Sequence, residues 1–167
     1  MWKKVVEYLG GHPERLVVAR VIIENGLTVR DGGIYCNEIE IPATSIARVA
    51  KVDTRTVKHT LKSIEDNPEL KVIFGHLRSA GHSLKDIARY VGFQVVEITS
   101  DDARRPGILA GSAQLLAESK IGIRQAIVDD PELSPEPKLT LIAETSLPGE
   151  LVPKLLRLNG VKKVSVY

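Results

Sequence analysis

The hydrophobic pattern of the first 92 residues is mainly helical, because apolar residues recur three or four positions apart. Behind Pro13 this spacing predicts a helix over Glu14–Asn25. The residues expected on its buried side are Leu16, Val17, Val21 and Ile22. Between residues 28 and 41 apolar and polar residues alternate instead, and the Gly32-Gly33 pair favours a β-hairpin there. Two short helices should follow, over Thr44–Ala50 and Thr54–Glu65.

For residues 67–92 the sequence predicts a helical connector between the two domains. Apolar residues from Leu70 to Leu77 mark one face of a helix that stops near Gly81, and Ser83 can cap a shorter helix that reaches Val91. This second stretch looks like the first half of a helix-turn-helix. However, a strand-like segment begins at Phe93, where a recognition helix would have to start, so we do not interpret it as a groove-binding motif.

From residue 93 onward, strand-like and helical segments alternate. The predicted strands are Phe93–Ser100, Ile121–Asp129, Lys138–Ser146 and Val161–Tyr167, and the predicted helices are Pro106–Lys120 and Pro148–Asn159. The order β-α-β-β-α-β is that of a ferredoxin-like sandwich, a four-stranded antiparallel sheet with two helices on one face. We therefore expect an α+β chain with an N-terminal domain over 1–66, a connector over 67–92 and a C-terminal domain over 93–167.

Composition places the chain among ordinary folded proteins, with 43% hydrophobic and 26% charged residues in a total of 167. Cys36 is the single cysteine, so no disulfide within the chain is possible, as is usual in a reducing compartment. No segment has the length of a membrane span, and the first residues lack the apolar run of a signal peptide. We therefore expect a cytoplasmic protein without a membrane partner.

The net charge of +2 excludes little, but cations cluster locally between Ala43 and Ser63. Five cations stand there against the single acid Asp53, and they are Arg48, Lys51, Arg55, Lys58 and Lys62. Local clustering of this kind is typical of a surface that contacts phosphates.

The segment from Ile46 to Val57 resembles the helix-turn-helix of bacterial and archaeal-type repressors. We expect Ile46, Val49 and Val52 to fill the wedge between two crossing helices, with small alanines that allow a close approach. Asp53 is a natural N-cap for the second helix. The position between the helices that is usually glycine is Lys51, which would cost roughly 1 kcal/mol in a left-handed conformation.

The second helix of this motif should turn Val57, Leu61 and Ile64 inward. The residues that remain for a DNA major groove are Arg55, Thr56, Lys58, His59 and Lys62. An alternative without DNA is a helical packing module that binds a protein or supports dimerisation.

The first crossover of the C-terminal domain combines acidic residues, Pro106-Gly107 and an aliphatic residue. This loop resembles the ligand loop of ACT domains, and the whole chain resembles the predicted regulators of amino acid metabolism that join a helix-turn-helix to an ACT domain. The resemblance implies an amino acid ligand, bound between subunits of a homodimer or higher homo-oligomer that pairs through the sheet. The ligand-binding residues that it implies are Asp101, Asp102, Arg104, Arg105, Pro106, Gly107, Ile108, Ile123, Arg124 and Gln125. Leucine-responsive feast/famine regulators share this general plan, but the hairpin and the helical connector favour a different family.

The sequence contains no recognisable catalytic motif. The four histidines lie in unlike contexts, and neither a metal-ligand spacing nor a phosphate-binding glycine loop occurs, so we expect no enzyme, no metal and no cofactor. The sequence thus predicts a ligand-responsive transcriptional regulator. Two alternatives remain open: a regulatory subunit that binds an amino acid and modulates a metabolic enzyme, and an oligomerisation protein without a ligand.

Overall fold

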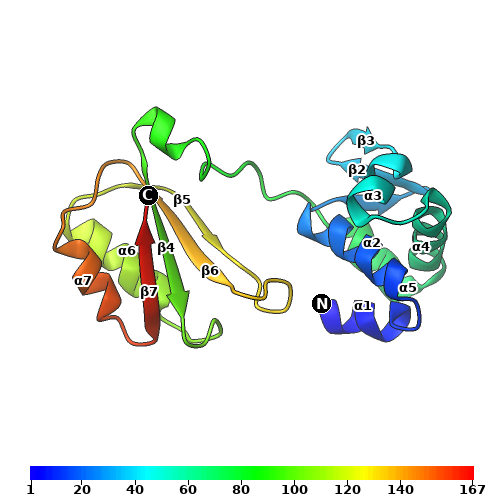
Figure 1. Ribbon diagram of the computed structural model, residues 1–167. Coiled ribbons are helices and arrows are strands. Elements are labelled where there is room, and N and C mark those ends of the chain that lie inside the picture. The colour runs from blue at the N-terminus through cyan, green and yellow to red at the C-terminus, as the bar shows by residue number, and fades with distance from the viewer. The chain divides into compact units, whose positions relative to one another are not determined.

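The computed structural model describes residues 1–167 and divides into two compact units, Met1–Gly81 and His82–Tyr167 (Figure 1). Each unit contains helices and one antiparallel sheet, so the chain has the predicted α+β class. None of the helices is both long enough and apolar enough to cross a membrane.

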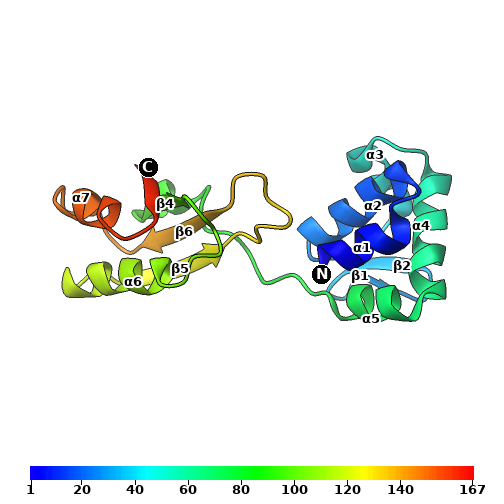
Figure 2. The ribbon, with the colours of Figure 1, turned by 90° about the horizontal axis from the view of Figure 1, so that it is seen from below.

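The first unit consists of helices around a small sheet with the strand order β1-β2-β3 (Figure 2). Its elements are α1 (Trp2–Leu9), α2 (Pro13–Glu24), β1 (Thr28–Arg30), β2 (Gly33–Cys36), β3 (Ile39–Ile41), α3 (Ala43–Ala50), α4 (Thr54–Asp66) and α5 (Pro68–His76). Helix α2 packs against α1, α3 and α4, while α5 packs against α4 and β1. The sequence analysis did not predict α1, which contributes only Val5 and Leu9 to the core.

Two side chains expected inside the first unit are exposed. Val17 lies outside the core, because α2 is apolar on nearly every side and packs through Val18 and Ile22 instead. Val49 is 64% exposed, since α3 turns its alanines Ala47 and Ala50 inward. In both helices the hydrophobic pattern alone did not determine which face is buried.

The second unit has the predicted β-α-β-β-α-β order. Its elements are the 3₁₀-helix η1 (Ala88–Val91), β4 (Gln94–Ser100), α6 (Ile108–Glu118), β5 (Ile123–Val128), β6 (Lys138–Ala143), α7 (Leu151–Leu156) and β7 (Val161–Val166). The strand order is β5-β6-β4-β7 with antiparallel neighbours throughout. Both helices cover one face of the sheet, where Leu116 of α6 and Leu155 of α7 pack against Ile98 and Leu141.

The predicted connector over 67–92 is divided between the two units. Helix α5 belongs to the first unit, because Leu70 and Phe74 are buried there. The helix expected over Ser83–Val91 does not form as such: this part of the chain is a turn followed by η1. It is held instead by Ala88, which is buried against the sheet.

Candidate functional sites

The turn between α3 and α4 is short and is closed by backbone hydrogen bonds. Lys51 adopts the left-handed conformation (φ 55°, ψ 44°), and its N–H donates to the carbonyl of Ala47. The N–H of Val52 donates to the same carbonyl at 3.0 Å. The lysine therefore ends α3 as a glycine would, at a cost of about 1–2 kcal/mol for a residue with a Cβ.

Helix α4 begins and packs as the sequence predicts. The Oδ1 atom of Asp53 accepts a hydrogen bond from the N–H of Arg55 at 2.7 Å, which satisfies one free donor of the first turn. Val57, Leu61 and Ile64 are all buried, so they fix the rotation of the helix about its axis. This rotation determines which side chains face outward.

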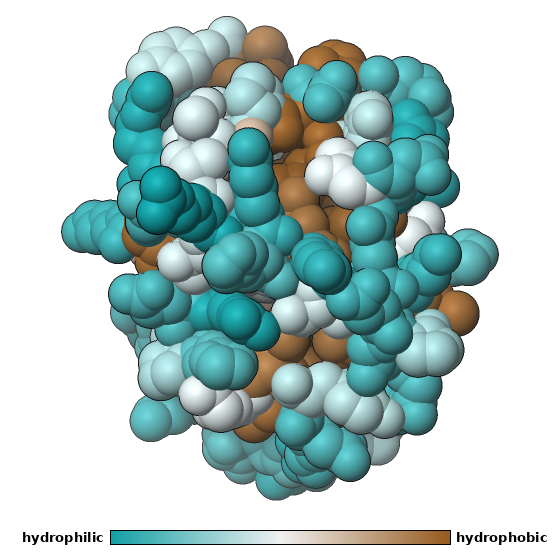
Figure 3. Space-filling view, turned by 90° about the vertical axis from the view of Figure 1, so that its right-hand side faces the viewer, coloured by the Kyte–Doolittle hydropathy of each residue, from teal (hydrophilic) through white to brown (hydrophobic).

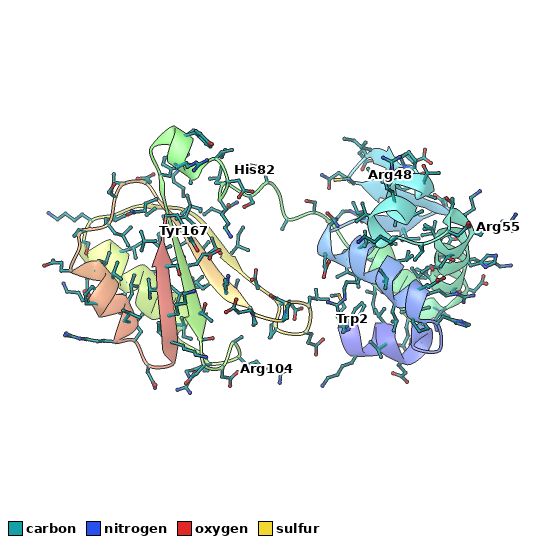
Figure 4. All side chains as sticks on the ribbon, viewed as in Figure 1. Trp2, Arg48, Arg55, His82, Arg104 and Tyr167 are labelled. Atoms are coloured by element: carbon teal, nitrogen blue, oxygen red, sulfur yellow. The ribbon has the colours of Figure 1, made fainter.

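Three of the five predicted DNA contacts form one cationic stripe on α4: Arg55, Lys58 and Lys62. All three are exposed, and none forms an ion pair. At 3.6 residues per turn they lie on the side of α4 that is opposite its buried residues. Figure 4 shows Arg55 extending outward from α4, and hydrophilic side chains cover most of that side of the unit in Figure 3. Charges without a partner are available to phosphates.

Thr56 and His59 line a crevice of about 300 Å³ together with the start of α2. The Oγ1 atom of Thr56 lies 3.3 Å from a carboxylate oxygen of Glu14, to which it donates a hydrogen bond. His59 is exposed and lies four residues after Arg55 and three before Lys62, so it adjoins the cationic stripe, whereas Thr56 faces the start of α2.

The loop between β4 and α6 is held by its own charged residues. Asp101 pairs with Arg105 at 3.1 Å, and Arg105 also donates to the side chain of Asn159 at 3.0 Å. The Oδ1 atom of Asp102 accepts a hydrogen bond from the N–H of Arg104 at 2.9 Å. These contacts shape the loop, so the side chains of Asp101 and Arg105 are already engaged.

A cavity of about 260 Å³ lies beside this loop, and we call it the loop cavity. Its lining is mostly apolar and consists of Ile98, Ser100, Ala103, Arg105, Pro106, Gly107, Ile108, Leu109, Val128, Asp129, Pro137, Lys138 and Leu139. Four of the predicted ligand-binding residues are among them, namely Arg105, Pro106, Gly107 and Ile108. Asp101, Asp102 and Arg104 line a more polar, adjoining cavity of about 460 Å³, which shares Ser100, Ala103 and Pro137 with the first.

Helix α6 starts at the loop cavity without a side-chain cap. Gly107 has φ 98° and leaves open space where a Cβ would stand. Glycine is needed here for its backbone conformation rather than for a close approach of another atom. The uncapped N–H groups of the first turn can therefore receive an anion.

Ile123, Arg124 and Gln125 lie at the opposite end of the sheet within one chain. Ile123 is paired with Ala143, at the end of β6, whereas the loop cavity is formed where β6 starts. Arg124 lies over the ring of Phe93, with 5.3 Å from the guanidinium carbon to the ring centre. Within a single copy of the chain these three residues therefore do not line the loop cavity.

The sequence analysis missed the cavity residues that come from the other side of the sheet, Val128, Asp129, Lys138 and Leu139. The predicted strand order could have indicated them, because it places the hairpin between β5 and β6 next to the end of β4. The described residues contain no cluster of three or more side chains suited to holding a metal ion.

Comparison with known proteins gives no family for this chain. No family model matches it, and no curated protein matches it. Among solved structures it is similar to a transcriptional regulator at 13% identity, with 93% of this chain and 90% of that chain covered and a TM-score of 0.29. It is also similar to a transcriptional regulator from Neisseria meningitidis in complex with L-Met at 13% identity, covering 92% and 86% of the two chains with a TM-score of 0.26. TM-scores this low do not establish a shared function with either regulator.

Proposed function

We propose that the protein is a ligand-responsive transcriptional regulator that acts by binding rather than by catalysis. The first unit would bind DNA through α4, and the second would bind a small molecule, an amino acid, in the loop cavity. The observation that carries the proposal is the cationic stripe on α4, which lies opposite the packed face of that helix and follows a tight turn. A recognition helix needs both this packing and this free charge.

The DNA-binding part is tested by replacing Arg55 and Lys58 together with alanine. Each lost phosphate contact reduces the slope of log affinity against log salt by about 0.9, so we expect weaker duplex binding and a slope smaller by about two. Gel retardation and fluorescence anisotropy over a salt series measure both. The control is Lys3→Ala with Lys71→Ala, which removes the same charge from exposed positions on α1 and α5. Equal binding by both double variants would reject α4 as the DNA-binding helix.

The lining of the loop cavity favours an amino acid with an aliphatic side chain. The ammonium of Lys138 lies 3.6 Å from Glu97 and 3.6 Å from Glu136, and Arg105 is held by Asp101. The interior is therefore left to apolar groups, while the uncapped start of α6 offers N–H donors to a carboxylate.

The proposed preference for an aliphatic amino acid is tested by thermal-shift measurements with leucine, isoleucine, valine and methionine. Serine and aspartate are the polar amino acids for comparison. A ligand that binds only the folded state raises the melting temperature with its concentration. Ala103→Leu should abolish the shift by filling the cavity, whereas Ala110→Leu, at an exposed position on α6 outside the lining, should retain it. An unchanged shift in Ala103→Leu would place the ligand elsewhere.

We further propose that two copies pair through β5, which is an edge strand of the sheet. Its flank exposes apolar side chains, namely Leu109, Ile123, Ile127 and Val128. In an antiparallel pair related by a two-fold axis, the start of one β5 lies beside the end of the other. Ile123, Arg124 and Gln125 of a second copy would then stand next to Val128 and the loop cavity, where the sequence analysis expected a second wall.

The competing function is a regulatory subunit that binds an amino acid and a metabolic enzyme. It predicts the same thermal shift but no duplex binding at low salt. The DNA and ligand experiments together therefore distinguish the two functions.

A further inference from the structure

Residues 82–93, which we call the strap, lie at the end of the second unit's sheet where β4 begins (Figure 1), on the face that the helices leave open. Ala88 is buried with Val95 and Ile142, and Leu84 and Phe93 pack against this group. The side chain of Gln125 receives a hydrogen bond from the N–H of Leu84 at 2.8 Å and donates to the carbonyl of His82 at 2.6 Å. The strap is thus held by a small apolar cluster and a few polar contacts.

The strongest polar contact of the strap is to Glu97, in the middle of β4. The Glu97 side chain is only 6% exposed and forms an ion pair with the ammonium of Lys85 in the strap. Lys138 of β6 lies 3.6 Å from its other carboxylate oxygen, and the hydroxyl of Tyr167 lies 3.3 Å from that oxygen. A buried carboxylate is costly unless it is paired, so loss of Lys85 leaves it dependent on Lys138 and Tyr167.

Lys85 and Lys138 share one carboxylate and repel each other, since both carry a positive charge. The ion pair between Lys85 and Glu97 holds the strap, and the repulsion between Lys85 and Lys138 weakens that hold. The side chain of Lys138 lies on the same open face of the sheet as Glu97, whereas the loop cavity lies on the helix-covered face with Ile98 and Leu139. The main chain of Lys138 is tied to the end of β5, because its N–H donates to a carboxylate oxygen of Asp129 at 3.1 Å.

We propose that the strap is a latch on the sheet, locked by Lys85 and Glu97. Its consequence for DNA binding rests on the proposed function. The strap directly follows the first unit along the chain. Release of the nine residues from Leu84 to Gly92 would lengthen the tether between the units by about 30 Å, at roughly 3.3–3.6 Å per extended residue. The latch therefore sets how far the DNA-binding unit can reach from its sensor.

Hydrogen–deuterium exchange of the strap peptides in the full-length protein tests the latch without any ligand. Lys85→Met and Glu97→Gln should each accelerate exchange of residues 82–93 by about tenfold, as expected when a buried pair loses one partner. Lys138→Met should slow the same exchange by about threefold, because it removes the repulsion. The control is Lys163→Met, a lysine on the same face of the sheet that forms no ion pair with Glu97.

If Lys85→Met accelerates strap exchange and Lys138→Met slows it, the two lysines compete for Glu97. A general loss of packing would instead accelerate exchange in both variants. Exchange that is unchanged in Lys85→Met, or that is accelerated equally in Lys138→Met, overturns the latch. A matched measurement of the radius of gyration by small-angle scattering should show an increase in Lys85→Met and none in Lys163→Met.

Discussion

Two residues with left-handed backbone stand at the two proposed sites, and they differ in the strain that they carry. Lys51 ends α3 at φ 55° although it has a Cβ, whereas Gly107 begins the first turn of α6 at φ 98° without one. The sequence analysis expected Pro106 to begin a helix and did not predict the positive φ of Gly107. The turn position of Lys51 was identified because the residues on either side resemble a helix-turn-helix in type and spacing.

At the scale of single residues we predict that Gly107→Ala destabilises the second unit by about 1–2 kcal/mol, the cost of a Cβ in left-handed backbone. The cause is conformational, because no atom lies within 4 Å of the position of the added Cβ. Gly149→Ala is the control, since that site also has open space but no positive φ. Chemical denaturation measures both, and equal effects of the two substitutions would refute the role of the backbone conformation.

Elements with a regular hydrophobic pattern were predictable from the sequence. Elements whose conformation depends on contacts with other segments were not. Alternating residues in β4 and β6 identified these strands, and the spacing of Val57, Leu61 and Ile64 identified the packed face of α4. The segment from Ser83 to Val91 has a helical pattern but forms mostly turns, because its side chains are satisfied by the sheet rather than by a helix. Tertiary contacts override local propensity in such short segments.

The candidate sites were predictable to a similar extent. The Pro106-Gly107 loop lines the cavity as expected, since the loop is local in sequence. Lys138 and Asp129 reach the same cavity through sheet register, which a motif cannot reveal. Glu97 sits among apolar residues of a predicted strand, and only the partners brought by the strap and β6 show why a carboxylate is tolerated there.

At the scale of elements, the pairing of the strap with β4 predicts a dependence on pH. The hydrogen bond from Lys85 lowers the pKa of Glu97 below its ordinary value of 4.5, with further lowering by the charges of Lys85 and Lys138 and by the Tyr167 hydroxyl, against the opposing effect of burial. The ionised carboxylate therefore contributes stability above pH 4.5 that is lost as the pH falls through the lowered pKa. Asp86 and Glu136 are the neighbouring acids of the two lysines.

The measurement is the difference in the free energy of unfolding of the second unit between wild type and Glu97→Gln. This difference should be constant from neutral pH down to about 4.5 and should shrink below it. Asp102→Asn, at an exposed carboxylate for which no such pairing exists, serves as the reference for general acid effects. A difference that stays constant into strong acid would contradict the assignment of Glu97 as the charged partner of the strap.

For the molecule as a whole, the proposed functions require more than one copy of the chain. A single α4 can contact only one half-site, whereas two copies related by a two-fold axis place two such helices on one duplex. A single loop cavity, in turn, is open beside Val128, at the edge where β5 has no neighbouring strand. Pairing through β5 would meet both requirements with the same contact.

We therefore predict that Ile127→Lys shifts the protein toward a monomer, because a charged side chain on an edge strand opposes the addition of another strand. The side chain of Ile127 is 37% exposed, so the substitution should leave the folded second unit intact. Sedimentation equilibrium should give about half the wild-type mass, while Ser165→Lys, on the edge strand β7 at the other side of the sheet, should keep the wild-type mass. In the same variant, duplex affinity should fall for a two-half-site operator but not for a single half-site, since each α4 remains unchanged. A variant that keeps its full mass would exclude β5 as the pairing edge, and with it the placement of Ile123, Arg124 and Gln125 beside a neighbouring cavity.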